Sequence, residues 1–239
     1  MNRKAAFALG AAIAAFGWVK DTIGATIAGW TFETSAPGGA GTTTVGASIG
    51  PFNPEIGSGS AVGVHAAGTT QWSNPAGNGS LESFSANVWA AGDYYQFQVD
   101  STNLQNIMIS FDQTRSATGP NAFDLQYSTD GTTYTNFGSY TLAGTGWSTV
   151  SAATVPGNSF SFDLSSVTAL NNDSSIFFRL TSNGLNSSGG AVASGGTARI
   201  DNVFVTGSAI PEPASLGLMT AAAAATMVRR NRSREDAKK

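Results

Sequence analysis

Apolar and polar residues alternate in several short stretches of the chain. Tyr95, Phe97 and Val99 are separated from one another by glutamines, which places the apolar side chains on one face and the polar ones on the other. The same period of two recurs at Ile107, Ile109 and Phe111, at Phe123, Leu125 and Tyr127, at Ile176, Phe178 and Leu180, and at Val203 and Val205. This period is typical of strands that bury one face, and it predicts an all-β domain.

Shorter apolar stretches and turn residues extend this pattern. Further strands are predicted at residues 27–33, 43–49, 62–66, 87–91, 134–142 and 159–164. Asp130 and Gly131 lie between two predicted strands, as in a β-hairpin turn, and the segment that begins at Leu164 predicts a single turn of helix. About ten short strands joined by turns predict an antiparallel β-sandwich over residues 26–209.

The composition supports strands and removes several classes of chemistry. Only 11% of the residues are charged and glycine occupies 29 positions, which favours strands joined by tight turns. The chain has no cysteine, so disulfides, thiolate metal sites and cysteine nucleophiles are excluded. Residues 26–209 contain eleven carboxylates and three arginines, a net charge of −8. We therefore expect no nucleic-acid partner, because binding of phosphates needs a basic surface.

Residues 1–25 have the layout of a signal peptide. Arg3 and Lys4 precede an apolar run at 5–19, and small residues follow it. Cleavage is expected after Ala25 or after Ala28. The alternative is that this segment remains in place as an N-terminal membrane anchor.

Residues 210–239 combine a proline motif, an apolar run and a basic end. The run at 214–228 would be about 22 Å long as a helix, which is short for a hydrocarbon core of about 30 Å. The basic cluster of Arg229, Arg230 and Arg232 follows it and would hold this end in the cytoplasm with the body outside. This layout suits a transient anchor, and the alternative is a proline-kinked amphipathic helix of a cytoplasmic protein.

Pro211, Glu212 and Pro213, followed by the alanine-rich run and the basic cluster, resemble the PEP-CTERM sorting signal. The resemblance implies that these three residues are recognised by an exosortase, a membrane enzyme that cuts near the motif and passes the body to the cell surface. It also implies that the basic cluster acts as the topological stop and that the C-terminal helix inserts only transiently into the inner membrane. The sequence departs from the usual pattern in its tail, which continues to Lys239.

The segments ISFDQTR, FDLQYSTDGTTY and ARIDNV resemble the body that is common in PEP-CTERM proteins and is akin to extracellular jelly rolls. The resemblance implies a jelly-roll-like antiparallel β-sandwich, flanked by an N-terminal signal helix and a short C-terminal hydrophobic helix. It implies a protein exported to the cell envelope surface or the extracellular matrix, and it names no ligand.

Carbohydrate binding is the main ligand hypothesis for this body, with extracellular polysaccharide as the partner. Sugars stack on exposed aromatic rings and hydrogen-bond to amides and carboxylates. Trp72 and Trp147, which stand beside polar and glycine-rich residues, are the candidate stacking platforms.

Calcium is the one cofactor that the residues suggest, since a hard cation needs only oxygen ligands. Its candidate ligands are Asn171, Asn172, Asp173 and Asp201, for which turn and loop hydrogen bonds are the alternative role. The single histidine, His65, lies in an apolar run without a nucleophile motif, so we expect it to be structural.

The scarce cations of the acidic body, Arg115, Arg179 and Arg199, are expected to pair with Asp112 or Asp201, because a guanidinium satisfies several carboxylate oxygens. No catalytic residue is predicted. A hydrolase that uses two close carboxylates remains an alternative. The carboxylates that lie at or near predicted strands are Asp100, Asp112, Asp124, Asp163 and Asp201.

The sequence therefore predicts a non-catalytic exported surface protein whose body binds glycans. Two alternatives stay open. One is a secreted polysaccharide hydrolase or lyase of the same fold, and the other is a structural or adhesive coat protein without a small ligand.

Overall fold

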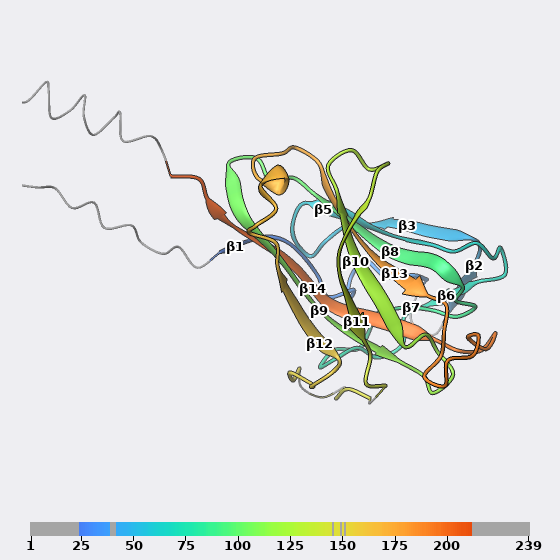
Figure 1. Ribbon diagram of the computed structural model, residues 1–239. Helices are drawn as coiled ribbons and strands as arrows, with labels where there is room; N and C mark the ends of the chain where they lie inside the picture. The colour runs from blue at the N-terminus through green and yellow to red at the C-terminus, as the bar shows by residue number, and fades with distance from the viewer. Residues whose placement is uncertain (1–23, 39–41, 145, 149, 151, 212–239) are drawn as a thin grey trace, which may run out of the picture.

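Two antiparallel sheets pack face to face in the computed structural model, which describes residues 24–38, 42–144, 146–148, 150 and 152–211 (Figure 1). Most of the predicted signal peptide and of the sorting tail, including Glu212, Pro213 and the basic cluster, lies outside these residues. Among the residues that are described, no helix is long and apolar enough to cross a membrane.

The larger sheet has eight strands and holds the longest ones. Its main path runs, in order of pairing, through β12 (Ser159–Asp163), β9 (Leu104–Arg115), β14 (Ala198–Ala209), β7 (Phe84–Ala86), β6 (Gln71–Ser73) and β2 (Thr43–Val45). The second half of β14 pairs instead with β1 (Ala25–Trp30), which in turn pairs with β4 (Ile56–Gly57). As a result β14 lies at the centre, between β9 on one side and β7 and β1 on the other.

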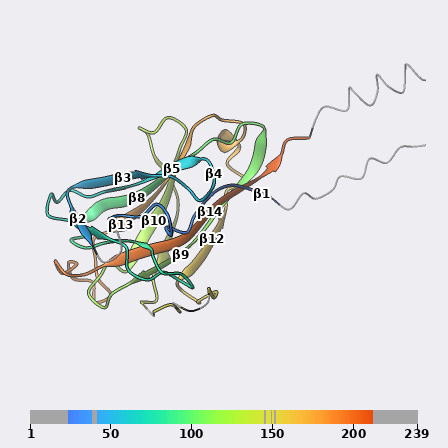
Figure 2. The ribbon, with the colours of Figure 1, turned by 180° about the vertical axis from the view of Figure 1, so that it is seen from behind.

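The smaller sheet has six strands and lies across the core from the larger one. Its order is β11 (Thr135–Thr141), β10 (Ala122–Ser128), β13 (Ile176–Asn183), β8 (Ala91–Val99), β5 (Gly59–Val64) and β3 (Ser48–Phe52). The two sheets can be followed from the opposite side in Figure 2. The prediction of two antiparallel sheets forming a sandwich is confirmed.

The core is built from the inward positions that the period-two pattern identified. In β8, β9 and β13 the predicted apolar residues are buried: Tyr95, Phe97, Val99, Ile107, Ile109, Phe111, Ile176, Phe178 and Leu180. Phe84 of β7, which the pattern did not single out, contacts four other aromatic rings, with centroids 4.7–5.7 Å apart. Burial of aromatic surface at this density is the main apolar contribution to folding.

The hairpin and the helical turn are confirmed. β10 and β11 pair antiparallel on either side of Asp130 and Gly131, and Gly131 has a φ of 70°, which suits glycine. Thr168–Leu170 forms a single 3-10 turn after Leu164.

The predicted strand at 87–91 is wrong for most of its length, because β7 precedes it and β8 begins only at Ala91. Asp93 accepts hydrogen bonds from the backbone nitrogens of Ala66 and Ala90 and so fixes a loop between the two strands. Val88 has a φ of 55°, a left-handed conformation outside the region of regular strands and uncommon for a β-branched residue.

The two ends of the described chain leave the sandwich side by side. Ala25 at the start of β1 is paired with Gly207 near the end of β14, and both ribbon views place these strands together (Figures 1 and 2). Pro211 is exposed two residues after β14 ends.

His65 is buried in the core at the end of β5, as a structural histidine would be. Its ring lies between those of Trp72 and Trp89, at centroid distances of 4.6 and 4.2 Å, and its Nδ1 is 3.1 Å from the Thr70 hydroxyl. Burial lowers the pKa of His65 to about 4, against the opposing effect of the backbone carbonyls of Val88 and Asn87.

This pKa predicts a titration that can be followed directly, because the chain has one histidine. In the folded protein, proton NMR of the His65 ring should show a midpoint near pH 4 instead of the usual 6.5. Between these two values the unfolded chain binds a proton that the folded chain does not, so His65 lowers the free energy of unfolding as the pH falls through this window. A midpoint near 6.5 would show that the ring is solvated and that the packing between the tryptophans is wrong.

Candidate functional site

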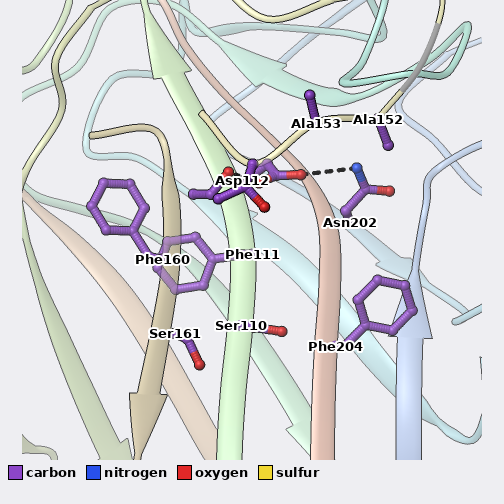
Figure 3. A pocket seen from close by; sticks show the side chains of 11 residues that line it. Ser110, Phe111, Asp112, Ala152, Ala153, Phe160, Ser161, Asn202 and Phe204 are labelled. Atoms are coloured by element: carbon purple, nitrogen blue, oxygen red, sulfur yellow. Dashed lines mark hydrogen bonds between the residues drawn. The ribbon is translucent and has the colours of Figure 1, made fainter. Parts of the chain in front are cut away.

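A groove of about 610 Å³ opens on the outer face of the larger sheet, beside the loop that leads into β12 (Figure 3). Its volume is in the range of small-molecule sites. Three strands and this loop supply the lining residues, which are Ser110, Phe111, Asp112, Ala152, Ala153, Thr154, Ser159, Phe160, Ser161, Asn202 and Phe204. The groove lies near the middle of β14. It is several residues away from Ala209, where the two ends of the described chain leave the sandwich.

A β-bulge in β14 sets the positions of the polar groups. Asp201 is paired with Asp112 of β9, but the next pair joins Phe204 to Ser110, so two residues of β14 oppose one of β9. Asn202 lies in this bulge with a φ of 50°, a left-handed conformation that asparagine tolerates better than most residues. The bulge turns the Asn202 side chain toward Asp112, and its Nδ2 donates to Asp112 Oδ2 at 3.0 Å, as the dashed line in Figure 3 marks.

The Asp112 carboxylate is held by three donors from three segments of the chain. Besides Asn202, the Nδ2 of Asn78 donates to Oδ2 at 2.9 Å, and the hydroxyl of Ser159 donates to Oδ1 at 2.5 Å. Asn78 also donates from Nδ2 to the carbonyl of Ala153 in the groove wall. The carboxylate is therefore fixed in position but keeps lone pairs free, since it can accept about four hydrogen bonds.

Asp201 stands behind the groove and supports it without reaching it. The side chain has no exposed surface, and its Oδ2 accepts from the backbone nitrogen of Asn78 at 2.7 Å and from the Ser80 hydroxyl at 2.9 Å. Its Oδ1 accepts from the backbone nitrogen of Asn202 at 2.8 Å, which fixes the bulge. Burial, with a smaller contribution from the Asp112 charge, raises the pKa of Asp201 to about 6 against the lowering effect of these hydrogen bonds.

Phe204 supplies the aromatic surface of the groove. Its side chain points to the outer face of β14, where it is half-buried, and it lies across Gly29 of the neighbouring strand β1. A methyl group at residue 29 would come within 2.7 Å of Cε1 and 2.8 Å of Cδ1 of this ring. The absence of a side chain at Gly29 therefore allows the ring to lie against the sheet.

The groove can hold a ligand that offers an apolar face and several hydroxyl groups. The side-chain hydroxyls of Ser110 and Ser161 have no hydrogen-bond partner among the described residues, and neither has the Oδ1 atom of Asn202. Figure 3 shows the two serines on adjacent strands, with Phe204 on the next. The Phe204 ring, the Asp112 carboxylate, the Asn202 amide oxygen and the Ser110 and Ser161 hydroxyls thus border the same open space.

The prediction that Trp72 and Trp147 are stacking platforms is wrong. Trp72 is completely buried against Phe84 and His65 and donates from Nε1 to the carbonyl of Gly46. Trp147 is only 8% exposed, packs near the Arg199 guanidinium and donates to the carbonyl of Ala76. Polar neighbours in the sequence did not indicate exposure, because other segments cover both rings: His65 and Phe84 contact Trp72, and Ala76 and Arg199 contact Trp147.

The four candidate calcium ligands do not come together. Asn171, Asn172 and Asp173 lie in a turn next to the start of β9, where Asn172 Oδ1 accepts from the backbone nitrogen of Asn103. Asp201 is paired with Asp112, eight residues farther along β9 from Leu104, which is roughly 26 Å of strand. Among the described residues, no group of three or more His, Asp or Glu side chains could hold a metal ion.

The arginines form no salt bridge with Asp112 or Asp201 among the described residues, although the Asp201 charge opposes the lowering of the Arg199 pKa by burial. Arg115 donates to the backbone carbonyls of Leu142, Ser116 and Ala117, and Arg199 donates to the carbonyl of Ala76. Arg179 lies on the other sheet and donates to Gln96. The two carboxylates are satisfied by amides, hydroxyls and backbone nitrogens instead.

Sequence reasoning missed the groove residues that matter most, namely Phe204, Asn202, Ser110 and Ser161. Asp112 and Asn202 lie within the quoted segments ISFDQTR and ARIDNV, but no local pattern shows that these segments are neighbours. The one usable signal was the Asp201-Asn202 pair in the middle of an alternating strand, because asparagine is depleted in regular strands and tolerates the left-handed conformation.

No protein-family model matches the chain, and no curated protein matches it in sequence. Among solved structures, the chain is similar to the CBM22-2 xylan-binding domain of Xyn10C from Paenibacillus barcinonensis, with 16% identity and a TM-score of 0.42. That match covers 76% of this chain and 99% of the xylan-binding domain.

A second similar structure is the K1 cleaved adhesin domain of Lys-gingipain from Porphyromonas gingivalis W83, with 12% identity and a TM-score of 0.41. The match covers 77% of this chain and 98% of the adhesin domain. The chain is thus similar in structure to carbohydrate-binding modules and to adhesin domains, at a level that supports no statement about its ligand.

Proposed function

We propose that this protein is exported to the cell surface or extracellular matrix and that its sandwich binds a neutral polysaccharide in the groove beside Asp112. The observation that carries this proposal is the arrangement of the Phe204 ring, the Asp112 carboxylate and the Asn202 amide around one open groove. A sugar ring has an apolar face that packs on an aromatic side chain, and its hydroxyl groups donate to carboxylate and amide oxygens.

The charge of the groove favours a neutral sugar over an acidic one. Asp112 is the one carboxylate among the described lining residues, and none of them is basic. The body as a whole has a net charge of −8. A sugar carboxylate in this groove would be repelled by Asp112, whereas a hydroxyl group can donate a hydrogen bond to it.

The rigidity of the site supports binding at low entropic cost. Asp112 and Asn202 are already fixed by Asn78, Ser159 and Asp201, so neither side chain must be ordered when a ligand arrives.

The hydrolase alternative is less well supported by this geometry. Two-carboxylate hydrolysis needs both groups to face the scissile bond at separations of about 5 to 9 Å. Asp201 is adjacent to Asp112, but it is buried and both of its oxygens accept hydrogen bonds from the protein. We therefore propose a binding role without catalysis. The coat-protein alternative requires self-association and predicts no effect of glycans on melting temperature.

The export part of the proposal rests on the two ends of the sequence, and the position of β1 refines it. Ala28 is buried and lies in the middle of β1, so cleavage after it would remove most of the pairing of this strand with β14. Cleavage after Ala25 leaves that pairing almost intact. At the other end, Pro211 is exposed beyond β14, which gives a sorting enzyme access to the motif.

Intact-mass spectrometry of the protein recovered from medium and membranes should therefore find an N-terminus at Thr26 and a C-terminus close to Pro211. An N-terminus at Gly29 would contradict the proposed role of β1 in the mature protein. A mature chain that still ends at Lys239 would exclude the exosortase as a partner.

Phe204→Ala should weaken binding to a neutral polysaccharide by about five-fold, since loss of an aromatic contact costs about 1 kcal/mol. Affinity gel electrophoresis of the exported protein against a panel of neutral polysaccharides measures this. Met108→Ala is the matched control, because Met108 is 38% exposed on the same sheet face but does not line the groove. If no polysaccharide of the panel retards the wild type, the binding proposal fails.

Gly29→Ala should reduce the same binding by displacing the Phe204 ring, although residue 29 does not line the groove. The backbone at Gly29 does not need a positive φ, so the melting temperature should change little. Isothermal calorimetry with the retarding polysaccharide, together with thermal unfolding, separates the two effects. Unchanged affinity in Gly29→Ala would show that the ligand does not contact the Phe204 ring.

A further inference from the structure

The outer face of the six-stranded sheet carries a second cluster, formed by Arg179, Tyr94, Tyr134 and Gln96, which we call the Arg179 cluster. Arg179 lies on β13 between Phe178 and Leu180, which are both buried, so its side chain points away from the core. Its guanidinium carbon lies 3.6 Å from the ring centre of Tyr134 and 4.0 Å from that of Tyr94. Two aromatic contacts at this distance hold the planar group in one orientation.

The hydrogen bonds within the Arg179 cluster occupy its acceptor oxygen and leave donor groups unpaired. Arg179 Nε and the Tyr134 hydroxyl both donate to Gln96 Oε1, each at 2.9 Å. Because a guanidinium nitrogen can only donate, the Gln96 amide must turn its oxygen to Arg179, and its NH2 group is left without a partner among the described residues.

The neighbouring strand repeats this arrangement. Gln126 of β10 is paired with Arg179, and its Oε1 accepts from the Thr181 hydroxyl at 3.0 Å. Its amide NH2 group also has no partner among the described residues. Gln126, Arg179 and Gln96 therefore form a row across three adjacent strands in which the unused groups are donors.

Arg179 makes no salt bridge with a carboxylate of the described chain, although residues 26–209 hold eleven acidic side chains. Arg115 and Arg199 also form no salt bridge among the described residues, but both donate to backbone carbonyls, whereas the one hydrogen bond of Arg179 is from Nε to a side chain. The cation is oriented by the rings and by Gln96, and its charge remains available to a ligand.

The surface next to the cluster is hollowed but acidic. Gln98, two residues from Gln96 on β8, lines a hollow of about 280 Å³ together with Ser58, Ser60 and Asp100. The Asp100 carboxylate would repel an acidic sugar unit. The anion-binding site is therefore confined to Arg179 and the glutamines beside it.

We propose that Arg179, clamped between Tyr94 and Tyr134, binds the carboxylate of an acidic polysaccharide on the outer face of the six-stranded sheet. A guanidinium matches a carboxylate in a two-bond fork, and the free NH2 groups of Gln96 and Gln126 donate to the hydroxyl and ring oxygens around it. This site is on the opposite sheet from the groove and has the opposite chemistry, with donors in place of acceptors. It does not depend on the proposed binding of a neutral sugar.

The test uses polygalacturonate, a polymer of uronic acid, and the same polymer with its carboxylates methyl-esterified. The exported protein should bind polygalacturonate at least about ten-fold more tightly than the ester in calorimetry, because esterification removes the charge that pairs with Arg179. Arg179→Gln should abolish this difference. Arg179→Lys should weaken binding to polygalacturonate about ten-fold, because lysine keeps the charge but lacks the fork.

Two control measurements separate the Arg179 site from the groove. Phe204→Ala, in the groove, should bind polygalacturonate like the wild type, and Arg179→Gln should keep any affinity for neutral polysaccharide.

If Arg179→Gln does not fold, NMR of the wild type replaces it. The ring signals of Tyr94 and Tyr134 should shift with galacturonate and not with its methyl ester. Equal binding of both polymers, wild-type affinity in either Arg179 variant, or equally tight binding of poly-glutamate would overturn the proposal.

Discussion

The antiparallel pairing of β14 with β9 is the constraint on which most of this structure depends. The two twelve-residue strands form the centre of the larger sheet, and β14 also pairs with β7 and β1. Its inward residues Ile200, Val203 and Val205 are completely buried, so the register of this pair decides which side chains reach the core. That register shifts at two places, between Asp201 and Phe204 and between Thr206 and Ser208, and the groove lies at the first of them.

A buried carboxylate stabilises the bulge. Asp201 accepts hydrogen bonds from Asn78, Ser80 and the backbone of Asn202, and it connects the loop at 77–82 to the central strand. Gly77 is required there, because a Cβ at this position would lie 2.2–2.3 Å from Asp201 Oδ2, Ser80 Oγ and the carbonyl of Glu82. The groove is therefore held rigid by the hydrogen bonds of Asp201, which lie behind it and are not in contact with a ligand.

The groove and the Arg179 cluster differ in the polar groups that they leave free. In the groove these are the Asp112 carboxylate and the Asn202 amide oxygen, whereas at the cluster and the adjacent Gln126 they are the Arg179 guanidinium and glutamine NH2 groups. Acceptors suit neutral hydroxyl groups and donors suit an anion. The two proposed sites are thus complementary in chemistry, so occupation of one does not compete with occupation of the other.

The sequence by itself determined the all-β class, the inward faces of β8, β9 and β13, and the hairpin at Gly131, because period-two patterns and turn residues act over a few neighbouring positions. Only the tertiary structure decided the site. Asp112 and Asn202 are ninety residues apart in the chain, and Trp72 is buried by segments that its own neighbours do not reveal. Strand pairing over such separations depends on the packing of the whole core, so exposure and contact at the groove and at Arg179 follow from the fold and not from any local pattern.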